Sequence, residues 1–215
     1  MQMYHIENVL PQDIEQRSME IIESEMPQIA KLPYARRQVV KRVIHTTADF
    51  DYFEHLCFSE NVCERTLQML TKKAVIVTDT QMALSGISKP AAKKLGVELA
   101  CFMADADVAG KAKKQGSTRA VAAMEKAASL YADRPLIFAI GNAPTALIKI
   151  AQMIRDGRVK PELVIGVPVG FVNVVQSKEM IMECDIPYIV AKGRKGGSTV
   201  AAAICNALLY QLYDR

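Results

Sequence analysis

The pattern of apolar positions along the chain changes near residue 74. Beyond it, short apolar runs rich in β-branched residues alternate with longer stretches in which apolar residues recur at helical spacing. The apolar runs lie at 74–78, 97–102, 135–140, 162–167 and 187–191. Helical spacing fills the stretches at about 80–95, 105–131, 142–156, 173–184 and 197–212. Continuous apolar strands separated by helices are typical of a parallel sheet that is buried on both faces.

The first third of the chain has helical spacing throughout. One stretch begins at Pro11 and ends at Pro27, and Ser18 lies on its apolar side. A second stretch ends in His45, and a third begins after Ser59, a residue typical of helix N-caps. We therefore predict a single α/β domain over 1–215. It would be three-layered and doubly wound, with a five-stranded parallel sheet and a helical N-terminal segment.

This fold predicts where a ligand site lies. In open α/β sheets, ligands bind beyond the carboxyl ends of the strands. The loops at that edge are rich in Gly, Pro, Asn, Thr and Asp, and they lie at 78–81, 103–107, 141–145, 166–173 and 192–199. We therefore expect the functional residues to come from these loops.

The last loop, "KGRKGGST", carries three cations, Lys192, Arg194 and Lys195, just before a predicted helix. Exposed amides at a helix N-terminus attract anions, whereas cations there oppose the helix dipole and need another reason to be present. The pattern favours an anion site over a solvated turn capped by Ser198. The loop lacks the spacing of a P-loop, and "GVPVGF" is not the glycine fingerprint of a dinucleotide site.

Other loops supply further candidates. Ser117 or Thr118 stands at the start of a predicted helix whose first turn holds Arg119. A cation there is disfavoured by up to about 1 kcal/mol unless an anion binds it. The competing interpretation is an ordinary surface arginine. Asn142 follows a strand and could be a helix cap as readily as a ligand contact. Asp79, beside Thr80 at another strand end, suits a helix cap better than a Mg²⁺ ligand.

His45, one of three histidines, has three interpretations: a general acid, a capping or core residue, and a metal ligand. It ends a helical column with Arg37 and Lys41, which favours a site facing a polyanion. A metal is the weakest choice, because no second histidine stands at ligand spacing. We favour the general acid, with Thr46 or Asp49 orienting the imidazole.

Composition excludes several classes of protein. The net charge is only +4, and aromatic residues make up 6% with no Trp, so base-stacking surfaces of nucleic-acid-binding proteins are poorly supplied. Five cysteines without a CxxC pair argue against a disulfide framework or a zinc ribbon. Apolar runs fall short of the roughly 20 residues that cross a bilayer, and no secretory signal pattern opens the chain. We expect a cytoplasmic protein without a membrane or nucleic-acid partner.

Several stretches together resemble the precorrin-8X methylmutase family, also called cobalt-precorrin-8 methylmutase. They are "RVIHTTADFDY", "VIVTDTQMALSGI", "GSTRAVAAM", "AIGNAPTAL", "VIGVPVGFVNVVQSKE" and "GRKGGSTVAAAI", in this order along the chain. The resemblance implies a flavodoxin-like fold, a homodimer and an isomerisation in cobalamin biosynthesis that needs no cofactor. A methyl group would move from C-11 to C-12 of the tetrapyrrole by a sigmatropic shift, giving hydrogenobyrinate or cobyrinate.

The resemblance places the family's catalytic histidine on His45 and its substrate-binding arginine on Arg119. By inference from the loops, we add further contacts to the substrate carboxylates, at Ser18, Thr80, Thr118, Asn142, Lys192, Arg194 and Lys195. An apolar slot for the macrocycle would come from Met82, Leu84, Phe171 and Val172.

Two other functions compete with the isomerase. A non-catalytic tetrapyrrole carrier would use the same cations without converting its ligand. A cobalt chelatase would need metal ligands from His5, His45 and His55, whose spacing does not support a site.

Overall fold

The computed structural model describes residues 6–213. Its sheet has six strands in the order β1-β6-β5-β4-β2-β3. The strands are β1 (Leu56–Phe58), β2 (Val75–Thr78), β3 (Glu98–Ala100), β4 (Leu136–Ile140), β5 (Leu163–Gly166) and β6 (Tyr188–Ala191). The five predicted strands are present and parallel to one another. The prediction of a five-stranded parallel sheet is nevertheless wrong, because β1 adds a sixth, antiparallel edge strand beside β6.

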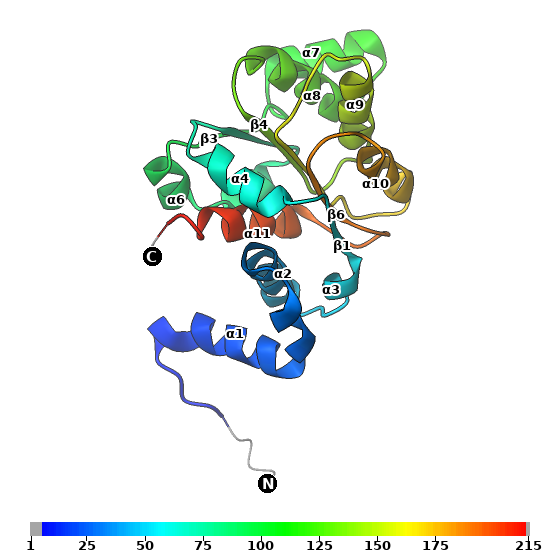
Figure 1. Cartoon of the computed structure of the whole chain (residues 1–215). Helices are drawn as coiled ribbons and strands as arrows, with labels where there is room; N and C mark the ends of the chain where they lie inside the picture. The colour runs from blue at the N-terminus through cyan, green and yellow to red at the C-terminus, as the bar shows by residue number, and fades with distance from the viewer. Residues whose placement is uncertain (1–5, 214–215) are drawn as a thin grey trace.

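Helices cover both faces of the sheet (Figure 1). One face is covered by α7 (Ala106–Gln115), α8 (Arg119–Leu130), α9 (Pro144–Arg155) and α10 (Val174–Met182). The other is covered by α4 (Val62–Leu70), α5 (Gln81–Gly86), α6 (Lys89–Lys94) and α11 (Ser198–Leu209). The core on this side continues beyond α11 to α2 (Tyr34–Thr47). Successive strand residues serve opposite faces, so Phe138 joins the first core and Ile137 the second. Both are fully buried, which explains the continuous apolar runs.

Two of the long predicted helices are each divided in the structure. The stretch at 80–95 breaks at Ile87, and the Ser88 hydroxyl accepts the Ala91 amide to begin α6. The stretch at 105–131 breaks at Gly116, whose φ of +59° lies in the left-handed region that favours glycine. Of the two candidates for the next helix start, Ser117 and Thr118, it is the Thr118 hydroxyl that accepts the Val121 amide and begins α8.

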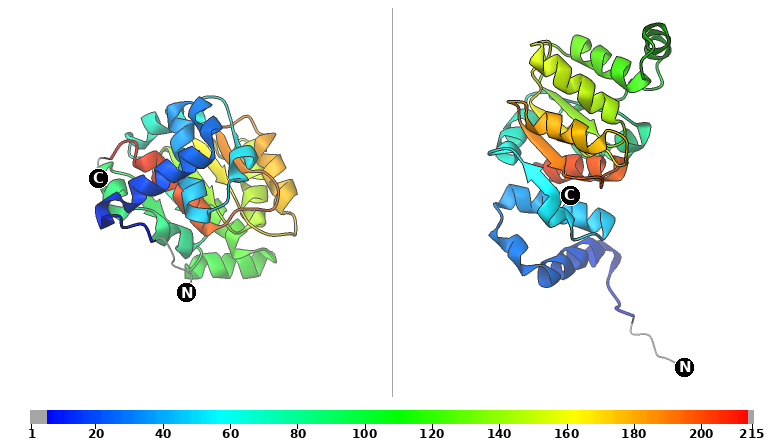
Figure 2. Two further views of the ribbon diagram at one scale, coloured as in Figure 1. Left: turned by 90° about the horizontal axis from the view of Figure 1, so that it is seen from below. Right: turned by 90° about the vertical axis from the view of Figure 1, so that its right-hand side faces the viewer.

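The N-terminal helices form a further layer outside α11. Helix α2 packs on α11, and α1 (Ile14–Glu25) lies on the far side of α2 from the sheet, as both views agree (Figures 1 and 2). Two ion pairs join α1 to α2: Lys41 to Glu23 at 2.7 Å, and Arg42 to Glu15 at 2.6 Å. These cations of α2 therefore already have carboxylate partners within the chain.

The short strand β1 determines where the end of α2 lies. Because β1 runs antiparallel to β6, its first residue Leu56 pairs with Ala191, the last residue of β6. The Lys192 amide donates to the carbonyl of His55 at 2.7 Å, just before β1 in the short helix α3 (Tyr52–His55). The chain between α2 and β1 is thereby held at the carboxyl edge of the parallel strands, where the ligand site was predicted.

Candidate functional site

The loops after β2 and β4 are joined by Asp79, a buried carboxylate. It accepts the amides of Gly141, Asn142 and Ala143 at 2.9, 2.8 and 2.6 Å, just before α9 begins. Burial raises the pKa of Asp79, although these three amides act in the opposite direction. Asp79 is thus a structural anchor for the loop, and the Asn142 side chain is not the cap of α9.

Thr80 and the start of α11 meet at the centre of this edge. The Thr80 hydroxyl accepts the Ala83 amide at 3.0 Å, which caps α5, and shares a 2.8 Å hydrogen bond with the Ser198 hydroxyl. A β-carbon on Gly141 would lie 2.7 Å from the Ser198 α-carbon, so only glycine permits this close approach. The predicted contact residues Thr80 and Asn142 therefore belong to neighbouring loops.

Arg119 and Thr118 lie next to the first turn of α9. The Thr118 and Thr145 hydroxyls lie 3.0 Å apart and share a hydrogen bond. Arg119 is exposed in the first turn of α8, and among the described residues it has no carboxylate partner. An unpaired cation at a helix N-terminus agrees with the expectation that an anion from outside the chain binds to it.

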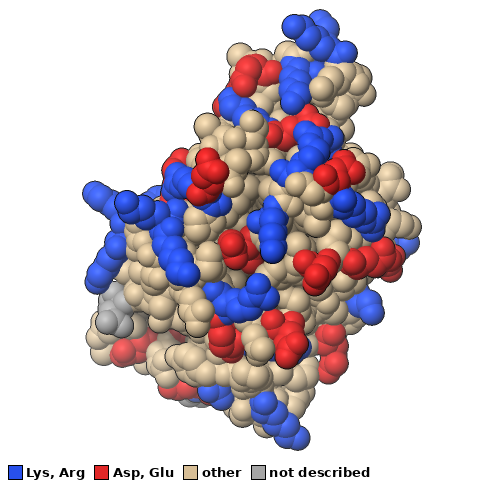
Figure 3. Space-filling view, turned by 45° about the horizontal axis from the view of Figure 1, so that its top comes forward, with Lys and Arg blue, Asp and Glu red and all other residues tan. Residues whose placement is uncertain are grey.

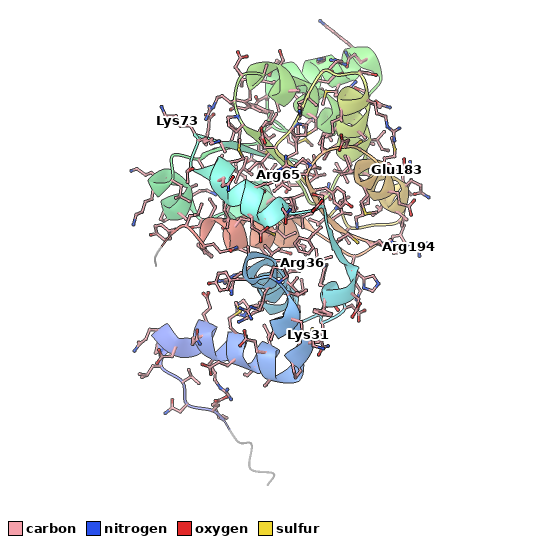
Figure 4. The ribbon with its side chains drawn as sticks, in the orientation of Figure 1. Lys31, Arg36, Arg65, Lys73, Glu183 and Arg194 are labelled. Atoms are coloured by element: carbon pink, nitrogen blue, oxygen red, sulfur yellow. The ribbon has the colours of Figure 1, made fainter. Side chains whose placement is uncertain are left out.

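The cationic loop after β6 is held by close backbone packing. The Gly197 amide donates to the Val167 carbonyl at 2.8 Å, and a β-carbon on Gly196 would collide with the same carbonyl oxygen. The guanidinium of Arg194 lies over the Phe171 ring, 5.4 Å from its centroid (Arg194 is labelled in Figure 4). Phe171 itself is 80% exposed. The loop thus presents a cation and an apolar ring side by side.

Lys195 differs from the other cations of this loop. Its ammonium contacts Asp49 and Asp51, each at 2.7 Å. These hydrogen bonds raise the pKa of Lys195 and lower that of Asp51. Lys195 therefore joins the loop to the segment that follows α2, whereas Lys192 and Arg194 have no ion-pair partner among the described residues. On the face shown in Figure 3, basic and acidic side chains are interspersed.

His45 and Ser18 line one hollow between α1 and α2. Its volume is about 340 Å³, and its lining is Ser18, Ile21, Ile22, Glu25, Ile44, His45, Ala48 and Phe50. The His45 side chain is exposed and, within residues 6–213, makes no hydrogen bond to the chain. It is therefore neither a core residue nor a hydrogen-bonding cap. An imidazole at the rim of a mostly apolar hollow is free to meet a ligand.

The proposed orientation of His45 by its neighbours is wrong. The Thr46 hydroxyl donates back to the Arg42 carbonyl at 2.8 Å, and Asp49 is paired with Lys195. Helix α2 instead ends at Thr47, and the next residue, Ala48, has a φ of +52° and donates its amide to the Ile44 carbonyl. The imidazole is thus placed by the course of the backbone rather than by a side-chain partner.

Sequence reasoning missed Lys178, which is only 1% exposed in α10. Its ammonium donates to the carbonyls of Gly193 and Lys195, both at 2.8 Å. Burial lowers its pKa to about 8. Nothing in its own helix reveals this role, because both acceptors lie far along the chain.

Several predicted apolar residues are exposed near the same edge. Met82 is 66% and Val172 78% exposed, while Leu84 is half-buried.

Within the described part of the chain, no group of three or more His, Cys, Asp or Glu side chains is placed to hold a metal ion. His5 lies outside the described residues. No helix in 6–213 is long and apolar enough to span a membrane.

Comparisons with known proteins agree with one another. The family model described as "Precorrin-8X methylmutase" matches residues 13–211. The chain is 43% identical to the cobalt-precorrin-8 methylmutase of Leptospira interrogans over 93% of each chain, and 42% identical to that of Salmonella typhimurium over 99% of this chain and 100% of the relative. A solved structure titled as precorrin-8x methyl mutase from Thermus thermophilus superposes with a TM-score of 0.82 at 35% identity, covering 92% of this chain and 96% of that one.

Proposed function

The chain belongs to the precorrin-8X methylmutase family, and we propose that it moves a methyl group from C-11 to C-12 of precorrin-8X or cobalt-precorrin-8. The reaction is an isomerisation in cobalamin biosynthesis. Its product is hydrogenobyrinate or cobyrinate, and the chain consumes no cofactor. The single observation that carries the assignment of the chemistry is the exposed, unbonded imidazole of His45 at the rim of the α1–α2 hollow.

The loops at the carboxyl edge of the sheet suit a flat macrocycle that carries carboxylates. Arg119, Lys192 and Arg194 are cations without carboxylate partners among the described residues. Charge-assisted hydrogen bonds from such groups to acetate and propionate side chains are stronger than neutral ones. Phe171, beneath Arg194, offers an apolar face to the ring system. Thr80, Thr118 and Asn142 supply further polar contacts around the same edge.

We assign His45 the role of proton donor to a nitrogen or carbon of ring C. A proton there makes the conjugated system electron-poor, which favours migration of the methyl group. The C-11–methyl bond breaks as the C-12–methyl bond forms, and the proton then returns to the imidazole, so that atoms and charge balance. We assign Ser18, which lines the same hollow, a contact to the substrate next to the imidazole.

The test is conversion of precorrin-8X, or its cobalt form, followed by absorption spectroscopy. We expect wild-type protein to convert many equivalents of substrate. His45→Ala, with its fold verified by circular dichroism, should convert it about 10²–10⁴-fold more slowly, the usual contribution of one general acid. Near-normal turnover by His45→Ala would refute the acid role. Stoichiometric binding by the wild type without any spectral conversion would instead indicate a carrier.

The proposal also covers the oligomeric state, the location and the fold classification of the protein. We propose a homodimer in the cytoplasm, with residues 1–215 acting as one domain. The parallel part of the sheet runs β3-β2-β4-β5-β6, which supports a flavodoxin-like classification, since it has the order 2-1-3-4-5 when β1 is set aside. Light scattering over a concentration series tests the dimer.

A further inference from the structure

Lys178 is a buried cation whose two hydrogen-bond acceptors are main-chain carbonyls. Burying an ammonium is costly unless its donors are satisfied. Here the donors meet Gly193 and Lys195 in the loop after β6, at 2.8 Å each. Gly193 has a φ of +79°, so this loop follows a course that ordinary residues adopt rarely. Lys178 thus holds an irregular loop against α10.

The loop after β6 also contacts the segment between α2 and β1, through Lys195 and through the Lys192 amide. The Lys195 ammonium binds both Asp49 and Asp51, and the Lys192 amide binds the His55 carbonyl. The Asp51 amide also donates to the Asp49 carboxylate at 3.0 Å, which gathers the two acids on one side of the turn. Asp49, the first residue of the segment that this loop contacts, lies four positions after His45.

These contacts lead from α10 to the turn that follows the helix of His45. Lys178 fixes the loop, Lys195 fixes Asp49 and Asp51, and the turn they occupy ends the helix that carries His45. We propose that Lys178 and Lys195 are positioning residues that set the place of the His45 imidazole relative to the substrate. The proposal rests on the function proposed above. It also gives Lys195 a role different from the carboxylate contact expected from sequence.

Kinetics separate positioning from substrate binding. We expect Lys195→Met to lower kcat about 10- to 100-fold, the scale of a misplacement of about 1 Å, with KM changed less than about twofold. Asp49→Asn with Asp51→Asn should reproduce the loss, and Lys195→Arg, which retains the ion pairs, should restore most of it. In a His45→Ala background, Lys195→Met should cause no further loss. A rise in KM without loss of kcat, or an equal loss in both backgrounds, would overturn the proposal.

A measurement without substrate tests the same claim where turnover is too slow to resolve. The ε1 carbon–proton resonance of the His45 ring, assigned with His45→Ala, should shift or broaden in Lys178→Met and in Lys195→Met. Lys149→Met is the matched control, because Lys149 is a part-buried lysine paired with Glu125 of α8 at 2.6 Å. It should leave the resonance in place.

An unchanged His45 resonance in Lys195→Met would refute the proposal. Because Lys195 is exposed, its variant remains informative even if Lys178→Met fails to fold. Because no substrate is present, this result stands apart from whether the chain isomerises a precorrin.

Discussion

At the scale of single residues, the cations of α2 and of the loops at the carboxyl edge of the sheet fall into two groups. Lys41, Arg42 and Lys195 have carboxylate partners within the chain, so ion pairs of the fold already neutralise their charges. Arg119 and Arg194 have none among the described residues. Sequence spacing could not separate these groups, because most of the partners lie far away along the chain. A cation without an internal partner at the ligand edge is the better candidate for a substrate carboxylate.

This distinction predicts the effect of Arg119→Ala. Losing one charge-assisted hydrogen bond costs about 1.5–3 kcal/mol, so kcat/KM should fall roughly 10- to 150-fold, mainly through KM. Arg65→Ala is the control, because Arg65 lies on α4 (Figure 4) and lines a separate hollow with Lys160 and Asp185. Steady-state kinetics on both variants decide the matter, and equal losses in the two would contradict the assignment.

Asp79 gives a second prediction at this scale. Two amides share one oxygen of its carboxylate, and a third uses the other. Asp79→Asn replaces one oxygen with a donor and leaves at least one buried amide unpaired, so we expect a loss of about 1–3 kcal/mol in the free energy of unfolding. Urea denaturation measures it. Unchanged stability would mean that the carboxylate does not anchor the 141–143 loop.

At the scale of elements, the sequence predicted what depends on local pattern. Strands β2, β4, β5 and most of β6 are buried on both faces, so each stands out as a continuous apolar run. Strand β3 is only partly buried but lies inside the apolar run at 97–102. Strand β1 does not stand out, because its three residues follow the short helix α3 directly and no longer apolar run surrounds them. Its role is global, since it brings the end of α2 to the ligand edge. Lys178 was missed for the same reason: a lysine in a helix is usually solvated, and its acceptors lie in another loop.

The end of α2 offers a test of backbone strain. Ala48 holds a φ of +52°, a conformation that costs a residue with a β-carbon about 1 kcal/mol. Ala48→Gly should therefore raise the free energy of unfolding by about 0.5–1 kcal/mol, after allowing for the greater entropy of the unfolded chain. The control Ala109→Gly, inside α7, should lower it by a similar amount. The urea midpoint should rise in Ala48→Gly and fall in Ala109→Gly relative to the wild type. A lower midpoint in both variants would contradict the strain at Ala48.

At the scale of the whole molecule, buried Lys178 couples stability to pH. Its pKa is about 8 in the folded state against 10.5 as the ordinary value, so unfolding takes up a proton between these pH values. The wild type should therefore gain stability relative to Lys178→Met as pH rises from 8 to 10.5, by at most about 3 kcal/mol. Below pH 8 the difference between the two proteins should be flat. Urea melts across this range check the sign, and a wild type that weakens relative to the variant would contradict it.

The central claim is that the chain moves a methyl group within a bound tetrapyrrole. The most direct measurement is a ¹³C NMR spectrum of precorrin-8X labelled at the C-11 methyl carbon, recorded before and after incubation with a small fraction of one equivalent of protein. The account predicts that the label disappears from C-11 and reappears in full on the C-12 methyl of hydrogenobyrinate. A label that stays on C-11 while the substrate is demonstrably bound would contradict it.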